Sequence, residues 1–243
     1  MDKLPLIRPD WPAPANITAY STTREGGVSG GRYSGLNVGA HVDDDADHVT
    51  ANRNQLPGAQ QITWLHQVHG HTVVTLPARH NTSADAAISR APNLWCAVMT
   101  ADCVPVLLCN RQGTEVAAVH AGWQGLEQAI ISHTLHAMQS SPADVLAWIG
   151  PAISQACYQV DDALARRFSD YANHIAPDPA AHNKYLLDLP GIAAAQLAHA
   201  GVGSVTNSAL CTYSDARRFY SHRRAQHEQA VPTGRLVSVI GLA

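Results

Sequence analysis

Three residues of this sequence have side chains that could together hold a metal ion: His69, Cys103 and His120. Each comes at the end of a run expected to form a strand, and strand ends are where sites are usually built. Two imidazoles and one thiolate suit Zn²⁺, whose catalytic sites usually have three protein ligands and an open fourth position. The residues lie too far apart for a local zinc finger, so the fold must assemble the site. The sequence therefore predicts one catalytic metal ion, zinc by preference.

The same residues allow other interpretations. A buried cysteine is often only a small apolar residue, and 14 histidines make chance proximity easy. Cys103 could instead be a nucleophile with His120 as its base, in a hydrolase or amidase without a metal. Met99 invites a copper site with an axial methionine, but it lies in an apolar run and is more simply a core residue.

Strands and helices must position these residues. Alternating apolar and polar residues over 17–23 predict a half-buried strand, which leads into a glycine-rich loop. Continuous apolar runs, typical of strands buried on both faces, predict a layered fold. Further strands are expected at 62–65, 71–76, 94–99, 104–109, 115–120, 145–149 and 236–242. Helices are expected at 45–56, 125–138, 161–171 and 191–200.

The composition favours one compact domain spanning residues 1–243. Apolar residues make up 46% of the chain and charged residues 14%, which is enough for a core and too little charge for disorder. A formal net charge of −3 gives no reason to expect binding to nucleic acid or acidic membranes. Charges and prolines near the start argue against a signal peptide, and no run reaches the ~20 apolar residues of a membrane span. Five cysteines without a Cys-x-x-Cys pair suit a reducing compartment, so we expect a cytoplasmic protein.

Eight short motifs, in order along nearly the whole chain, resemble those of the YfiH family, also called laccase-domain or multicopper polyphenol oxidase proteins. The motifs are Ser21-Thr22-Thr23-Arg24 with Gly26-Gly27, Leu36-Asn37-Val38-Gly39, Gln67-Val68-His69-Gly70, Ala84-Asp85-Ala86, Thr100-Ala101-Asp102-Cys103-Val104-Pro105, Val119-His120-Ala121-Gly122-Trp123, Ile149-Gly150-Pro151 and Phe219-Tyr220-Ser221-His222-Arg223-Arg224.

The resemblance implies an α+β fold of four layers, α/β/β/α, around a mixed β-sandwich, with a zinc site on His69, Cys103 and His120. It also implies cleavage of adenosine, inosine, guanosine and S-methyl-5′-thioadenosine by phosphate, with adenosine deamination as a side activity. Copper-dependent oxidation of phenols and editing of cell-wall precursors are further activities attributed to the family. The expected partners are a purine nucleoside and phosphate, and we expect a monomer.

Phosphorolysis needs groups that bind the anion, the sugar and the purine. Arg24, beside the glycine loop, is the first candidate for phosphate, because a guanidinium can pair bidentately with phosphate oxygens. Asn37 and Gln67 could hydrogen-bond the sugar or base, and Arg223 is the second anion candidate. Asp85 could act as an acid or base, or could orient a ligand histidine. A surface salt bridge for Arg24 and a turn cap for Asp85 are equally good interpretations from chemistry alone.

The chain departs from the family pattern at three places. Gln124 replaces an arginine that could face phosphate, so phosphorolysis would be weakened relative to deamination. The loop that leads from Arg223 and Arg224 to a Thr233-Gly234-Arg235 motif is longer than in the family and lacks an acid, and Gln159 stands where a glutamate is common. These departures give some weight to a binding module without catalysis. A true multicopper laccase is disfavoured, because such enzymes need several His-x-His pairs and this chain has only His69-Gly70-His71.

Overall fold

Two large β-sheets form the centre of the protein in a computed structural model, which describes residues 4–79 and 81–243. The first sheet has five strands in the order β1-β2-β14-β6-β3. Its neighbours are antiparallel except for β3 and β6, which are parallel. The strands are β1 (Leu6–Ile7), β2 (Ile17–Thr22), β14 (Leu236–Leu242), β6 (Trp95–Thr100) and β3 (Ile62–Thr63).

The second sheet has six strands in the order β13-β9-β7-β8-β5-β4. Its central strands are antiparallel, while each edge strand runs parallel to its neighbour. The strands are β13 (Ser204–Asn207), β9 (Val145–Ile149), β7 (Val104–Asn110), β8 (Val116–Ala121), β5 (Ala86–Ser89) and β4 (Val73–Thr75).

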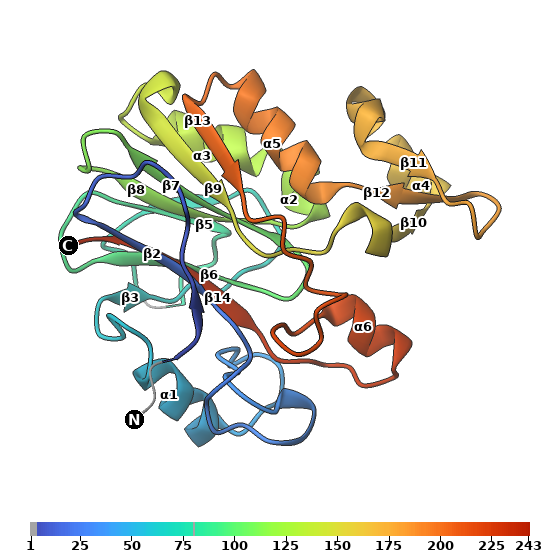
Figure 1. Ribbon diagram of the computed structural model, residues 1–243. Coiled ribbons are helices and arrows are strands. Elements are labelled where there is room, and N and C mark those ends of the chain that lie inside the picture. The colour runs from blue at the N-terminus through green and yellow to red at the C-terminus, as the bar shows by residue number, and fades with distance from the viewer. Residues whose placement is uncertain (1–3, 80) are drawn as a thin grey trace.

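The two sheets pack face to face, and a further layer covers each outer face (Figure 1). Side chains alternate across a strand, so Leu107 of β7 enters the core between the sheets while Val106 and Leu108 face the helices. Helices α2 (Trp123–Glu127), α3 (Ile130–Ala137) and α5 (Leu189–His199) cover the six-stranded sheet. Loops and α1 (Ala46–Asn54) cover the five-stranded sheet. The predicted four-layer α+β fold is confirmed.

A smaller module projects beside α5 (Figure 1). It contains a three-stranded sheet in the order β10-β12-β11. Its elements are η3 (Gln155–Cys157), β10 (Gln159–Asp161), α4 (Asp162–Arg166), η4 (Ser169–His174), β11 (Ile175–Pro177) and β12 (Lys184–Leu187). The remaining helices are η1 (Gly31–Tyr33), η2 (Pro142–Asp144) and α6 (His222–His227).

Helix boundaries differ from the sequence prediction in two places. The single helix expected at 125–138 is divided into α2 and α3 by Ala129, which has a left-handed φ of 57°. An apolar periodicity does not reveal such a break, because the residues on both sides still face the same sheet. The helix expected at 161–171 is likewise divided into α4 and η4.

The strand predicted at 17–23 exists as β2, but the prediction that one face is exposed is wrong. Tyr20 packs under the α1 layer and Ala19 packs between the sheets, so both faces are covered. Hydrogen bonds explain the polar residues there, since the buried hydroxyls of Ser21 and Ser238 lie 2.8 Å apart. Short strands such as β5, β12 and β13 were not predicted, because each has too few residues to show a clear pattern of apolar and polar positions.

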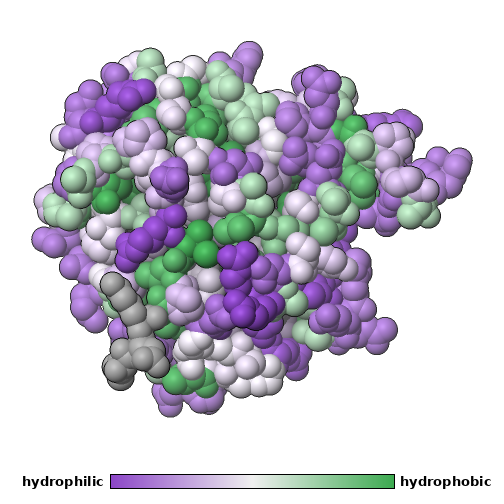
Figure 2. Space-filling model, in the orientation of Figure 1, coloured by the Kyte–Doolittle hydropathy of each residue, from purple (hydrophilic) through white to green (hydrophobic). Residues whose placement is uncertain are grey.

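Figure 2 shows one face of the molecule with polar residues over most of it and apolar patches between them. Exposed large apolar side chains include Val28, Val68 and Val231. Over residues 4–79 and 81–243, no helix has the length and apolar character needed to cross a membrane.

Candidate metal centre

His69, Cys103 and His120 come together at one end of the sandwich. One ligand atom from each lies within 4.8 Å of the other two. His69 lies in the loop between β3 and β4, Cys103 in the turn that carries the chain from β6 to β7, and His120 next to last in β8. That turn crosses from the five-stranded to the six-stranded sheet. The site therefore lies where the two sheets meet, as strand ends had suggested.

Strand register explains why Cys103 and His120 are neighbours. In the antiparallel pair of β7 and β8, Val104 is opposite Ala121. Cys103 therefore lies beside Gly122, which is the N-cap of α2. A Cβ atom placed on Gly122 would be 3.0 Å from Cys103 Sγ and 3.3 Å from His69 Cδ2. Glycine at this position keeps the space between the ligands open.

Asp85 holds two of the three predicted ligand residues in place. It precedes β5, and the register of β5 with β8 puts it beside His120. Its Oδ1 atom lies 2.8 Å from Nδ1 of His120 and 3.0 Å from the backbone nitrogen of His69. Its Oδ2 atom accepts from the backbone N–H groups of Gly70 at 2.8 Å and Val68 at 3.3 Å. With Nδ1 donating to Asp85, Nε2 of His120 is left as the ligand atom.

Each charged group at this site shifts the pKa of its neighbours so that their charged forms are favoured. Burial alone raises the pKa of Cys103, but the adjacent His120 and His69 outweigh that effect and lower the pKa. Burial lowers the pKa of His120, while Cys103 and Asp85 outweigh it and raise the pKa. Burial raises the pKa of Asp85, but hydrogen bonds from His120 and from the backbone lower it overall. A thiolate, the form that binds metal, is therefore favoured.

The backbone of two residues at the site is in the left-handed region. His69 has a φ of 59° and Asp102 a φ of 87°, although neither is glycine. Such conformations cost ~1 to 3 kcal/mol and persist only where surrounding contacts fix them. Asp102 is fixed by Thr212 Oγ1 at 2.6 Å, Ser221 Oγ at 3.0 Å and the backbone N–H of Arg223 at 2.7 Å. Asp102 therefore holds the turn that presents Cys103.

The residues present fit a metal ion that takes nitrogen and sulfur ligands. Three donors of the right chemistry converge, and the carboxylate of Asp85 orients one of them, as is usual around zinc. His120 is 3% exposed and Cys103 is half-buried, whereas His69 is exposed. The site is thus open to solvent on the side of His69. This donor set could hold zinc or copper.

Two residues predicted to bind substrate make hydrogen bonds within the fold. The amide of Gln67 donates to the carbonyl of Met99 at 2.9 Å and accepts from its N–H at 2.7 Å. Asn37 is fully buried, with its Oδ1 accepting from Arg235 N at 2.8 Å and its Nδ2 donating to Asp44 at 2.7 Å. Gln67 thus fixes the His69 loop to the end of β6, and Asn37 fixes its own loop to Asp44 and Arg235.

Arg24, the first candidate for phosphate, packs on the ring of Tyr220, 4.7 Å from its centroid. Its guanidinium donates to the carbonyl of Ser34 at 3.1 Å and to that of Ala216 at 3.4 Å. An open hollow of about 600 Å³ lies beside it, lined by the glycine loop and by Arg217. None of the three ligand residues lines this hollow.

Arg223 and Gln124, the other candidates for contact with the anion, have different surroundings. The Arg223 guanidinium lies over Tyr158, 4.8 Å from the ring centroid, and donates to the carbonyl of Gln159 at 2.6 Å. Gln124 is the second residue of α2 and is half-buried. The side chain of Gln159 is exposed in β10 and donates to Asp178. Met99 lies in the outer core, where its sulfur accepts a hydrogen bond from Arg53, as expected of a core residue.

Several residues that the sequence interpretation had not selected also lie near the metal centre. Electrostatic interactions indicate that His41 lies near His69 and Arg53, and that Arg235 lies near Cys103. His222 lies near His69 and Asp102, and Tyr158 near Cys103, where burial raises the pKa of Tyr158 to about 12. Their scattered positions in the chain gave no local signal, although Arg235 and His222 belong to recognisable motifs.

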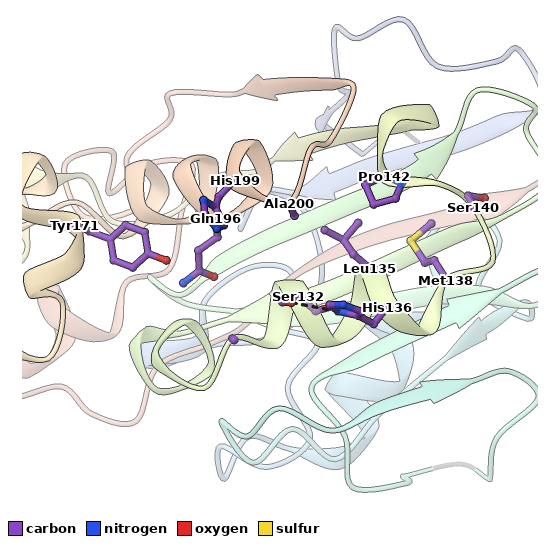
Figure 3. A pocket seen from close by; sticks show the side chains of 11 residues that line it. Ser132, Leu135, His136, Met138, Ser140, Pro142, Tyr171, Gln196, His199 and Ala200 are labelled. Carbon is purple, nitrogen blue, oxygen red and sulfur yellow. Dashed lines mark hydrogen bonds between the residues drawn. The ribbon is translucent and has the colours of Figure 1, made fainter.

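A separate cavity of about 720 Å³ lies between α3 and α5 (Figure 3). The side chains of Tyr171 and Gln196 point towards one another across it, and Leu135 and Met138 lie further along. None of the predicted site residues lines this cavity. The metal centre is therefore preferred as the functional site, because it has convergent ligands and perturbed pKa values.

Comparisons with known proteins agree with this fold. Residues 18–243 match the family described as multi-copper polyphenol oxidoreductase laccase. "Purine nucleoside phosphorylase YfiH" of Escherichia coli (strain K12) is 42% identical over 98% of both chains. A Pseudomonas aeruginosa protein also named as a purine nucleoside phosphorylase is 40% identical over 97% of this chain and 98% of its own. The crystal structure of a Neisseria meningitidis protein matches with a TM-score of 0.88 and 37% identity over 99% of both chains. The chain therefore belongs to the YfiH, or laccase-domain, family.

Proposed function

We propose that this protein is a zinc-dependent purine nucleoside phosphorylase. Its substrates would be adenosine, inosine, guanosine and S-methyl-5′-thioadenosine, and its products the free base and the (methylthio)ribose 1-phosphate. The observation that carries the proposal is the convergence of His69, Cys103 and His120 around a position open to solvent. Two relatives carry the name purine nucleoside phosphorylase, and these names support the choice of reaction.

Phosphorolysis breaks the bond between ribose C1′ and the purine, forms a C1′–O bond to phosphate, and lets the departing base take up a proton. A zinc ion, when bound, supplies a Lewis acid at the reacting group. Asp85 keeps the proton of His120 on Nδ1, and so keeps Nε2 directed at the metal. Because residue 122 is glycine, no side-chain carbon crowds the sulfur of Cys103.

Adenosine deamination is proposed as a side activity of the same centre. It replaces the amino group of the purine with oxygen from water and releases ammonia, so it needs no phosphate. The two reactions therefore share the metal and the purine site but differ in the anion that must be bound.

A metal-free cysteine hydrolase is the second candidate, because the imidazoles lower the pKa of the Cys103 thiol. Such an enzyme, acting on an amide of a cell-wall precursor, would use His120 as the base. Copper-dependent phenol oxidation is the remaining alternative, since Cu²⁺ binds most such sites more tightly than Zn²⁺.

One experiment separates these candidates. Protein purified without added metal is analysed for zinc and copper, then incubated with each nucleoside with and without phosphate. We expect one zinc per chain and phosphate-dependent release of base and ribose 1-phosphate. Base release without phosphate would point to hydrolysis, whereas cleavage of an amide in a cell-wall precursor by fully metal-free protein would support the cysteine hydrolase. If phenol oxidation appears only after copper is added, that activity depends on the added copper and is not a property of the protein as purified.

A further inference from the structure

Arg235 lies beside the metal centre because of the register of β14. Leu236, the first residue of β14, is opposite Thr100 at the end of β6. Arg235 therefore lies next to the turn that carries Asp102 and Cys103. Its backbone N–H donates to Asn37, and its aliphatic stem packs on Gly39, where an added Cβ would be 2.7 Å from Arg235 Cγ.

The guanidinium of Arg235 has unused donors. Its Nη1 atom donates to the carbonyls of Thr233 at 2.8 Å and Gly234 at 3.3 Å. Over residues 4–79 and 81–243, its Nε and Nη2 atoms make no hydrogen bond to the protein and no carboxylate lies within salt-bridge distance. Its immediate acidic neighbour, Asp102, is already bound by Thr212, Ser221 and the backbone of Arg223.

Arg53 adds a second positive charge to the surroundings of Arg235, whereas the nearby imidazoles of His41 and His222 are held in their neutral forms. Burial and the charges of Arg235 and Arg53 together lower the pKa of His41 to about 4. Arg53 stacks on Trp64, 3.8 Å from the ring centroid, with its Nε donating to the carbonyl of Val38 at 2.9 Å. Burial and the charge of Arg235 also lower the pKa of His222. A half-buried guanidinium with free donors in such surroundings is suited to an anion.

We propose that Arg235 binds the phosphate co-substrate beside the metal centre. Its two free donor positions would contact oxygens of a tetrahedral oxyanion, either inorganic phosphate or the phosphate group of a sugar 1-phosphate. Identification of the anion as phosphate rests on the proposed phosphorolysis. Arg24 differs because its guanidinium is engaged by Ser34, Ala216 and the ring of Tyr220.

The test compares Arg235→Met with Arg24→Met in zinc-loaded protein. Methionine keeps much of the packing on Gly39, and the backbone bond to Asn37 does not depend on the side chain. Phosphate and ribose 1-phosphate binding are measured by calorimetry without nucleoside, and KM for phosphate is measured with inosine. We expect Arg235→Met to raise the Kd and KM for phosphate at least tenfold, with zinc content and nucleoside Kd unchanged. Arg24→Met should alter the phosphate constants less than threefold.

Arg235→Lys keeps a charge but loses the planar donors, so its phosphate Kd should lie between those of the wild type and Arg235→Met. This variant also serves if Arg235→Met does not fold. Unchanged phosphate binding in the two Arg235 variants, or no phosphate binding by the wild type, would overturn the assignment. Phosphate binding that depends on Arg235 in a protein without phosphorolysis would instead overturn the proposed function and leave the anion site intact.

Discussion

The carboxylate of Asp85 and the imidazole of His120 form a buried pair, with 2.8 Å between Oδ1 and Nδ1. Both side chains are nearly inaccessible, at 0% and 3% exposure. The same carboxylate accepts from the backbone of the loop that carries His69. Asp85 thus connects two of the three residues that are predicted to be metal ligands.

Replacing Asp85 with asparagine should weaken metal binding. The amide cannot accept all the hydrogen bonds that both carboxylate oxygens accept now, so the His120 ring and the His69 loop lose their fixed orientation. Loss of such a partner typically costs ~10-fold to 100-fold in metal affinity. Zinc affinity is measured by competition with a chelator. The control is Asp188→Asn, since Asp188 makes a similar pair with His174 at 3.2 Å outside the site, and it should leave zinc affinity unchanged.

Each of Cys103→Ala, His69→Ala and His120→Ala should abolish bound zinc and turnover while the chain stays folded. Three protein ligands are the usual minimum for such a site, whereas the sandwich core supplies most of the stability. His120→Ala should also lower stability by ~1 to 3 kcal/mol, because Asp85 loses a buried partner. Metal analysis, circular dichroism and thermal unfolding check these expectations. Full activity of metal-free Cys103→Ala would refute the metal assignment.

A methyl group at position 122 should also disturb the metal centre. The added Cβ of Gly122→Ala would be 3.0 Å from Cys103 Sγ, so the thiolate or the backbone must shift. We expect weaker zinc binding and lower kcat with little loss of stability. Gly30→Ala is the matched control, because its added Cβ would have no neighbour within 4 Å. Equal zinc affinity in the two variants would show that the site tolerates the shift.

Cysteine alkylation in the metal-free protein should depend on pH in a residue-specific way. The lowered pKa of Cys103 means that its thiolate persists below the usual value of 9.0, and its reactivity falls only as the pH drops through the lowered pKa. Hydrogen bonds from Ser154 and Ser214, acting against burial, lower the pKa of Cys211 to about 7. Burial should leave Cys96 and Cys109 unreactive.

Peptide mapping after iodoacetamide treatment identifies the modified residues. Zinc should protect Cys103 and leave Cys211 reactive, so Cys211 serves as an internal control. Equal labelling of Cys103 with and without zinc would argue that its sulfur is not a ligand.

Gln124→Arg should shift the product ratio from adenosine deamination towards phosphorolysis. An added guanidinium at this half-buried position of α2 would favour a bound anion, whereas deamination requires no phosphate. Inosine and adenine released from adenosine are measured across a phosphate titration for both proteins. Identical ratios at every phosphate concentration would show that residue 124 faces solvent and has no part in the reaction.

The sequence determined much of the layered fold. Strands β9 and β14 begin and end at the predicted residues 145, 149, 236 and 242, because each is a largely apolar run buried on both faces. The choice of His69, Cys103 and His120 also came from the sequence, through strand ends and through the family motifs. Their proximity agrees with that choice, while their function as ligands stays a prediction.

Only the tertiary structure decided which polar side chains are free to act. Gln67 and Asn37 looked available in the sequence, yet their amides are engaged by Met99, Asp44 and Arg235. Arg235 was part of a terminal motif without an assigned role, and the register of β14 with β6 brings it to Cys103. A sequence gives each residue's chemistry, but hydrogen-bond partners across distant strands depend on pairing and register, which no local pattern specifies.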